Sequence, residues 1–222
     1  MIIAIDGPAG AGKSTVTRLL AERLGFQFLD TGAMYRAVTW CALERGVDLG
    51  DEAALADLAQ RLTVTFESEQ VFVDGQDVTT AIREPRVTRN VGSIADAVEV
   101  RHHLVRLQRE IASRGDFVCE GRDQGTVAFP DAFCKIYLTA SESDRAQRRM
   151  EQLGLADEPL NFEQILEEQR LRDQQDLSRK VGRLQQAEDA VVVNTDGKSL
   201  DEVVGELLAI VAQARRRKAS RI

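Results

Sequence analysis

The chain has few of the residues that build disulfide frameworks or histidine-based metal centres. Its 222 residues include three cysteines and two histidines. Cys41, Cys119 and Cys134 lie far apart and form no C-x-x-C pair, so neither a disulfide framework nor a zinc site is indicated, and we expect a reducing, cytoplasmic setting. His102 and His103 are sequence neighbours that point to different faces of a helix, so they give little support to a histidine metal centre or a catalytic triad.

Long apolar runs and positive charge are also scarce. The opening apolar run at residues 2–5 is interrupted at Asp6, and no stretch approaches the roughly 18 apolar residues of a membrane span. The formal net charge of −7 disfavours nonspecific binding to nucleic acid or to an anionic membrane surface. The basic run at residues 215–218 ends a helical pattern, where cations complement the helix dipole. We therefore expect small-molecule partners, no nucleic acid and no membrane.

What the sequence does contain is a phosphate-loop motif near its start. Residues 7–14 fit G-x-x-x-x-G-K-[ST] and follow an apolar run that should form a strand. Glycines let backbone N–H groups converge on phosphates, Lys13 adds a positive charge, and the Ser14 hydroxyl is a hard oxygen ligand suited to Mg²⁺. We predict that this segment binds a nucleoside triphosphate through Gly7, Pro8, Ala9, Gly10, Ala11, Gly12, Lys13, Ser14 and Thr15.

The pattern of the rest of the chain predicts an α/β fold. Short β-branched or aromatic runs alternate with helical patterns, and they lie at residues 2–5, 26–29, 117–119, 134–138 and 191–193. This alternation indicates the three-layer fold of P-loop NTPases, with a parallel five-stranded sheet between helices. We expect the first helix to begin near Lys13 and to end near Gly25 in a left-handed cap. Further helices are expected at residues 52–61, 94–114, 161–179 and 200–214.

An insertion separates the second and third expected strands. The interval of residues 30–116 is much longer than one crossover helix and its loops require. Residues 62–66 and 71–73 alternate apolar and polar side chains, and Asp74-Gly75 is typical of a tight turn, so a small antiparallel sheet is predicted. We divide residues 1–222, taken as a single domain, into a core of 1–60 and 115–222 and an insertion of about 61–114.

A phosphate loop alone is shared by switch GTPases, motor and DNA-processing ATPases and small-molecule kinases. The segment Asn194-Thr195-Asp196-Gly197 does not match the guanine-reading N-K-x-D of a GTPase. A short chain with an insertion directly after the second strand instead suits an enzyme that clamps a small second substrate opposite ATP. We therefore favour a kinase.

Four motifs carry a more specific resemblance. They are the phosphate loop with its flanks at residues 5–15, Leu-Asp-Thr-Gly-Ala-Met-Tyr-Arg at 29–36, Glu-Gly-Arg-Asp-Gln-Gly-Thr-Val at 120–127 with Phe-Pro-Asp-Ala at 129–132, and Arg-Asp-x-x-Asp-x-x-Arg at 172–179. With these motifs the chain resembles the bacterial cytidylate kinases over nearly its whole length. The resemblance implies transfer of the ATP γ-phosphoryl group to CMP and dCMP with Mg²⁺, in pyrimidine nucleotide metabolism. It also implies that the insertion binds the monophosphate and that a short helical lid covers about residues 142–160.

The motifs supply arginines for the acceptor phosphate. A phosphate monoester is already a dianion at neutral pH and needs no general base, so catalysis consists of bringing anions together. Lys13, Arg122 and Arg179 are the catalytic candidates, and Arg36 joins the two arginines in gripping the acceptor phosphate, because a planar guanidinium can bind phosphate bidentately. Their alternative role is surface solvation or an ion pair.

Arg172, Asp176 and Arg179 fall at i, i+4 and i+7 of an expected helix, so they share one face. From the spacing alone, an exposed salt bridge is the simpler explanation. The resemblance makes Arg172 and Asp176 ribose contacts, with Asp176 accepting from sugar hydroxyls.

Selecting cytosine requires an acceptor for its N4 amine and a donor to its N3 and O2. Asp123 can accept and Arg101 can donate. The family pattern places Ser93 near the base and Thr31 in the acceptor site, although Ser93 fits equally well as the N-cap of the helix expected at 94–114.

Three lid arginines, Arg145, Arg148 and Arg149, could stabilise charge on the transferring group and exclude water. Solvation of a helix face explains at least two of them. We take Arg148 as the catalytic candidate.

Two other functions stay open at this point. One is a related P-loop kinase with another acceptor, such as UMP, dTMP or a small hydroxylated metabolite. The other is a nonenzymatic ATP-dependent switch or binding module. The inserted strands favour the cytosine-specific kinase, since Ser93, Arg101 and Asp123 give them a use. We expect a monomer because no surplus apolar face is evident.

Overall fold

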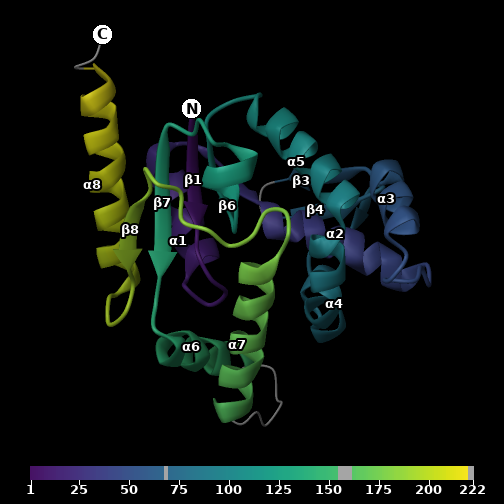
Figure 1. Cartoon of the computed structure of the whole chain (residues 1–222). Coiled ribbons are helices and arrows are strands. Elements are labelled where there is room, and N and C mark those ends of the chain that lie inside the picture. Colours follow the sequence, from purple (N-terminus) through teal and green to yellow (C-terminus); the bar gives the residue numbers. More distant parts are fainter. Residues whose placement is uncertain (68–69, 155–161, 220–222) are drawn as a thin grey trace. The chain divides into compact units, whose positions relative to one another are not determined.

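The computed structural model describes residues 1–67, 70–154 and 162–219 (Figure 1). Its contacts divide the chain into two units. The first combines Met1–Leu29 with Arg114–Ile222, and the second is Asp30–Ser113. Each unit has its own apolar core.

The first unit is built on a five-stranded sheet with the order β2-β6-β1-β7-β8. The strands are β1 (Ile2–Asp6), β2 (Gln27–Asp30), β6 (Phe117–Gly121), β7 (Cys134–Thr139) and β8 (Val191–Asn194). β1 lies in the middle and pairs in parallel with β6 and with β7, and β7 pairs in parallel with β8. Each expected strand is present, which confirms the α/β fold with a parallel five-stranded sheet.

Four helices belong to this unit among the described residues: α1 (Lys13–Leu24), α6 (Glu142–Gly154), α7 (Phe162–Ser178) and α8 (Leu200–Ala219). As predicted, α1 begins at Lys13, and Gly25 ends it in the left-handed conformation with φ of 68°. Leu20 of α1 and Leu207 of α8 pack with Ile5 and Ile136 of the central strands in one core, which fixes the start of α1 beside the end of β1.

Two expected boundaries reach residues outside the described ranges. The lid expected at 142–160 contains α6, and its residues 155–160 lie outside the description. The helix expected at 161–179 is α7, with residue 161 also outside. Because α7 ends at Ser178, Arg179 directly follows the helix.

The second unit joins helices to a small sheet. Its helices are α2 (Thr31–Glu44), α3 (Glu52–Arg61), α4 (Pro85–Asp96) and α5 (Val98–Ala112), with a 3-10 turn η1 (Ala81–Arg83). Strands β3 (Val64–Glu67), β4 (Gln70–Val73) and β5 (Gln76–Asp77) form an antiparallel sheet in that order. The predicted antiparallel sheet is thereby confirmed. Asp74 and Gly75 make the tight turn between β4 and β5, both with positive φ.

The second unit begins earlier than the expected insertion. Sequence reasoning placed residues 30–60 with the core, whereas the contacts group them with the inserted strands. The reason lies in packing: Met34 and Val38 of α2 and Leu55 of α3 share a buried cluster with Val71 and Ile82. These apolar positions are visible in the sequence, but periodicity does not show which core a helix joins.

The expectation of a single helix at 94–114 is wrong, because this range covers residues of two helices, α4 and α5. Ala97 has an extended ψ of 110° and separates α4 from α5. α4 begins at Pro85, a residue favoured in the first turn of a helix. Ser93 therefore lies inside α4, where its backbone carbonyl accepts from Ala97 N at 3.2 Å. The interpretation of Ser93 as an N-cap is wrong for the same reason.

The three cysteines are free and buried. Burial raises the pKa of Cys41 and of Cys134 to about 11 and that of Cys119 to about 12. Each thiol is therefore held in its protonated form at neutral pH. Over the described ranges, every helix falls short of the length and apolar character that a membrane crossing demands.

Candidate active site

The phosphate loop joins the end of β1 to the start of α1. Gly7 has no room for a side chain, since a Cβ there would lie 2.1 Å from the backbone oxygen of Leu138. Gly10 and Gly12 adopt positive φ of 79° and 84°. Lys13 is buried, and its Nζ donates to the Pro8 carbonyl at 2.7 Å, so the amine is folded back over the loop. A loop of this shape at a helix N-terminus is an anion-binding structure.

Ser14 and Thr15 follow in the first turn of α1, and both are exposed. In the parts of the chain that the structure describes, no group of three or more His, Cys, Asp or Glu side chains could hold a metal ion. The Ser14 hydroxyl fits Mg²⁺ all the same, because this ion commonly takes one or two protein ligands and completes its shell with phosphate oxygens and water.

Asp176 of α7 holds two of the predicted arginines. One carboxylate oxygen accepts from Arg122 Nε at 2.7 Å, and the other accepts from Arg179 at 2.9 Å. Burial raises the pKa of Asp176, but Arg122 and Arg179 outweigh it, so the pKa lies below its usual value. The alternative of an exposed salt bridge is wrong here, since Asp176 and Arg179 are both buried.

The same charges act on Lys13. Burial lowers its pKa to about 7, with Arg122 adding to the effect and the buried Glu120 opposing it. Arg172 and Asp176 contribute in opposite directions. The structure thus brings together the phosphate loop, the end of β6 and the end of α7, which the sequence presents as three separate motifs.

Asp123 is buried at the start of a short π-helical turn, η2 (Gln124–Ala128). Its backbone carbonyl accepts from the N–H groups of Thr126, Val127 and Ala128. The backbone of Asp123 thus holds the turn.

Two lid arginines contact the phosphate-loop region, and they do so differently. Arg145 is buried, donates to the Ala9 carbonyl at 3.0 Å and pairs with Asp173 at 2.7 Å. Arg148 donates to the hydroxyl and the carbonyl of Thr195 at 2.9 and 2.8 Å. Its guanidinium lies 3.7 Å from where a Cβ on Gly12 would be.

Sequence reasoning missed Asp173 and Thr195 as partners of these arginines. Asp173 was visible inside the 172–179 motif. Thr195 lies in a segment that does not match N-K-x-D, and the sequence gives no other sign of its contact with Arg148.

The remaining predicted residues lie in the second unit. Thr31 is buried at the first position of α2, whose N-cap Asp30 accepts from Ala33 N. Arg36 donates to the Ile82 carbonyl at 3.2 Å and to the Thr88 hydroxyl at 2.8 Å.

Arg101 of α5 is buried, with its guanidinium 5.4 Å from the centre of the Tyr35 ring. It also donates to the Ala95 carbonyl at 3.2 Å. Ser93 is exposed on α4.

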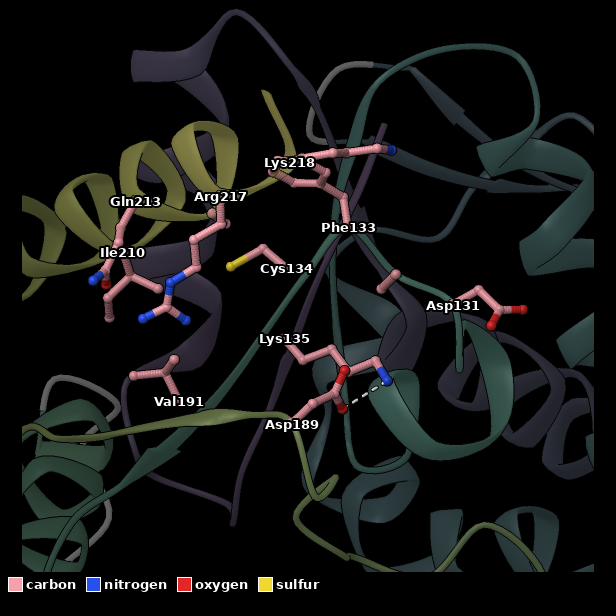
Figure 2. Close-up of a pocket in the computed structure, with 12 residues that line it drawn as sticks. Asp131, Phe133, Cys134, Lys135, Asp189, Val191, Ile210, Gln213, Arg217 and Lys218 are labelled. Carbon is pink, nitrogen blue, oxygen red and sulfur yellow. Dashed lines mark hydrogen bonds and ion pairs between the residues drawn. The ribbon is translucent and has the colours of Figure 1, made fainter. Parts of the chain in front are cut away.

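A cavity of about 580 Å³ lies elsewhere in the first unit, beside the amino ends of β7 and β8 and the end of α8 (Figure 2). Its walls include Phe133, Val191 and Ile210, with an ion pair between Lys135 and Asp189 at 2.8 Å. None of the predicted site residues lines it. In a parallel sheet this is the edge opposite the phosphate loop, so the cavity is separate from the charge cluster around Lys13.

The phosphate loop on a parallel five-stranded sheet, with arginines gathered beside its lysine, defines a P-loop kinase. Solved structures share the fold at low identity. A gluconokinase from Sinorhizobium meliloti 1021 aligns with a TM-score of 0.51 at 18% identity, over 99% of this chain and 95% of that one. An uncharacterized protein from Eubacterium ventriosum aligns with a TM-score of 0.55 at 12% identity, over 96% of this chain and 98% of that one.

Residues 3–213 match the family model described as cytidylate kinase. A curated cytidylate kinase from Rhodopirellula baltica is 47% identical over 220 residues, which cover 99% of this chain and 96% of that protein. One from Carboxydothermus hydrogenoformans is 44% identical, over 96% of this chain and 98% of that protein. A bifunctional pantoate ligase/cytidylate kinase from Trichodesmium erythraeum is 46% identical over 94% of this chain, which spans 40% of that protein. The chain belongs to the cytidylate kinase family.

The lowered pKa of Lys13 predicts proton uptake on nucleotide binding. With a pKa of about 7, about nine tenths of Lys13 is neutral at pH 8 in the free protein. A bound triphosphate favours the charged amine, so binding of MgATP at pH 8 should take up nearly one proton, whereas at pH 6 it should take up almost none. Calorimetric titration in two buffers of different ionisation enthalpy measures this number.

Lys13→Arg is the matched control for proton uptake, because a guanidinium stays charged at both pH values. It should bind the nucleotide without taking up a proton. Equal uptake by the variant and the wild type would show that another group titrates.

Proposed function

We propose that this chain transfers the γ-phosphoryl group of ATP to CMP or dCMP, giving ADP and CDP or dCDP, in pyrimidine nucleotide metabolism. The observation that carries the proposal is a buried cluster of charges. In it, Arg122 and Asp176 form an ion pair, and both shift the pKa of Lys13 in the phosphate loop. These residues come from motifs that the cytidylate kinase resemblance assigns to the donor and to the acceptor. Membership of that family supports the choice of acceptor.

Phosphoryl transfer requires positive charge near the phosphates and a fixed position of the acceptor relative to the donor. The acceptor phosphate is a dianion that attacks without a general base, so the cost of the reaction is repulsion between anions and charge on the transferring group. Arg122 and Arg179 would bind the acceptor phosphate, and Asp176 holds both guanidiniums in place. Lys13 would release the Pro8 carbonyl and bind the donor phosphates.

Mg²⁺ would bind at the Ser14 hydroxyl together with phosphate oxygens and water. It would supply charge stabilisation for the phosphate oxygens. Ser14 is exposed and lies next to the buried Lys13 in the first turn of α1, so one turn of helix would present both the lysine and the metal ligand.

The lid arginines are proposed to divide two roles. Arg148 is anchored on Thr195 and is partly exposed, so its guanidinium can turn toward the donor phosphates and act on the transferring group. Arg145 is tied to Ala9 and Asp173 in a buried position, and it supports the loop.

In the first unit, Asp123 is proposed to accept from the cytosine N4 amine. In the second unit, Arg101 is proposed to donate to N3 and O2, Ser93 to contact the base and Thr31 and Arg36 to contact the acceptor nucleotide. Arg172 and Asp176 are proposed to contact the ribose, with Asp176 using lone pairs that its two arginines leave available. Residues 61–114 are proposed as the monophosphate-binding insertion, within a unit that starts at Asp30.

The proposed setting is a monomer in the cytoplasm that handles small molecules, without nucleic acid or membrane. The net charge of −7 supports it, since a protein of this sign is repelled by polyanions.

A coupled assay of ADP release tests the reaction. MgATP is supplied with CMP, dCMP, UMP, AMP or dTMP, and a reaction without acceptor serves as the control. We expect strong turnover with CMP and dCMP and little with the others. Turnover with a different monophosphate would overturn the base assignment, and slow hydrolysis that no acceptor accelerates would favour an ATP-dependent switch.

Arg122→Met should lower kcat for CMP by about two to three orders of magnitude, because a charge on the acceptor phosphate is lost and Asp176 loses a partner. The affinity for MgATP, measured by calorimetry, should stay within about threefold. Arg170→Met on the same helix as Asp176 is the control, since Arg170 is an exposed partner of Glu142. Near-normal turnover in Arg122→Met would remove Arg122 from the acceptor site.

Asp123→Ala should lower the preference for CMP over UMP by at least about tenfold, since a buried acceptor for N4 disappears. The η2 turn should survive, because the backbone carbonyl of Asp123 holds it. The ratio of kcat/KM for the two nucleotides is the measurement. Asp189→Ala, which removes an exposed carboxylate, should leave that ratio unchanged, and an unchanged ratio in Asp123→Ala would refute base reading by this residue.

A further inference from the structure

Asp6 is a buried carboxylate that none of the roles above uses. It is the last residue of β1 and directly precedes Gly7 of the phosphate loop. Only 4% of its surface is exposed, in a strand whose other residues are apolar. Placing a carboxylate in a sheet interior costs free energy unless hydrogen bonds offset it. The partners of Asp6 therefore indicate what the residue is for.

Those partners are two successive backbone amides. One carboxylate oxygen accepts from Gln124 N at 2.8 Å, and the other accepts from Gly125 N at 2.7 Å. Burial raises the pKa of Asp6 to about 6, and the two amides oppose that rise by favouring the ionised form. A side chain of this length with two acceptor oxygens is available only from aspartate, because the asparagine amide would turn a donor toward one of the N–H groups.

The bound amides belong to a segment that carries two site residues. Gln124 and Gly125 directly follow Arg122 and Asp123, and they open the η2 turn that the Asp123 carbonyl holds together. Gly125 leaves little room for change, since a Cβ there would lie 3.2 Å from Lys135 Cδ and 3.4 Å from the Asp6 carboxylate. The segment is therefore held by the hydrogen bonds to Asp6 on one side and lies close to Lys135 on the other.

This contact joins the two catalytic parts of the first unit at one residue. Asp6 is covalently linked to the phosphate loop and hydrogen-bonded to the turn after Arg122-Asp123, while β1 and β6 already run side by side with Asp6 opposite Gly121. A displacement of about 1 Å in a group that positions a substrate can lower a rate by about a hundredfold. A rigid link at this point would keep the acceptor-binding arginine at a fixed distance from the donor phosphates.

We propose that Asp6 is a positioning residue for phosphoryl transfer, which sets Arg122 and Asp123 relative to the phosphate loop by accepting from Gln124 and Gly125. The proposal rests on the function proposed above. It predicts a defect in the chemical step and in base selection, whereas a residue that only stabilises the fold would affect neither at a temperature where the protein is folded.

The test compares Asp6→Asn with the wild type in the coupled assay. We expect kcat for CMP to fall by about ten- to a hundredfold and the CMP:UMP ratio of kcat/KM to fall by at least about threefold, with KM for MgATP changed by less than about threefold. Wild-type kcat together with a wild-type CMP:UMP ratio would overturn the proposal.

Leu207→Ala on α8 is the matched control for stability, because Leu207 is fully buried in the apolar core of the first unit and is not one of the predicted site residues. Both variants are assayed below their unfolding midpoints. If Leu207→Ala lowers kcat and the CMP:UMP ratio as much as Asp6→Asn does, Asp6 only stabilises the fold and the proposal is wrong.

Should Asp6→Asn fail to fold, Gly125→Ala replaces it. The added methyl group would lie 3.2 Å from Lys135 Cδ and 3.4 Å from the Asp6 carboxylate, so it would crowd the turn at the amide that Asp6 binds. The same two losses are expected, and a wild-type result would again overturn the proposal. The acceptor specificity of the wild type tests the proposed function separately from the role of Asp6. If the wild type phosphorylates another acceptor instead of CMP, the proposed function fails, and the effect of Asp6 on kcat is then read with that acceptor.

Discussion

The site depends on the attraction between one buried carboxylate, Asp176, and the two guanidiniums that it holds. Arg122 and Arg179 repel each other, and both the burial of Lys13 and the charge of Arg122 disfavour the protonated form of that lysine. In a partly dry interior such an assembly is stable only with negative charge in contact with it. Removing one partner of a buried ion pair costs about 3–5 kcal/mol, because the other charge is left unpaired. The two arginines therefore depend on Asp176 to stay close together. The surplus positive charge is then available to a phosphate.

The sheet explains how these charges come to share a place. β1 and β6 end at the same edge because they are parallel and adjacent, so the loop after β1 and the arginine after β6 are neighbours although more than a hundred residues separate them. α7 contributes Asp176 from a third part of the chain. Binding at the carboxyl ends of strands is the general rule for open α/β sheets. The opposite edge carries the cavity beside Phe133 and Lys135, away from this charge.

Much of this could be predicted from the sequence, and the limits have physical causes. The phosphate loop, the start of α1 and the five strands were predictable because each depends on local residues: glycines for the loop, Gly25 for the cap and apolar runs for the strands. The break between α4 and α5 at Ala97 was missed, since both sides carry one continuous helical pattern. Residues 30–60, which the sequence pattern places with the core, group with the inserted strands because apolar side chains of α2 and α3 pack in the core of the second unit, and periodicity does not show which core a helix joins. Asp6 escaped notice because a single charge after an apolar strand resembles an ordinary strand end. Its partners are backbone amides, which leave no trace in the sequence.

The burial of the cysteines has a practical consequence. Cys41, Cys119 and Cys134 are all buried, and the raised pKa of each leaves little thiolate at neutral pH. Thiol-reactive dyes attack the thiolate of accessible cysteines, so the native protein should be nearly inert toward them. A cysteine introduced on the surface of each unit could then be labelled selectively without first removing the natural three. Energy transfer between two such dyes would report the distance between the units in solution as nucleotides are added.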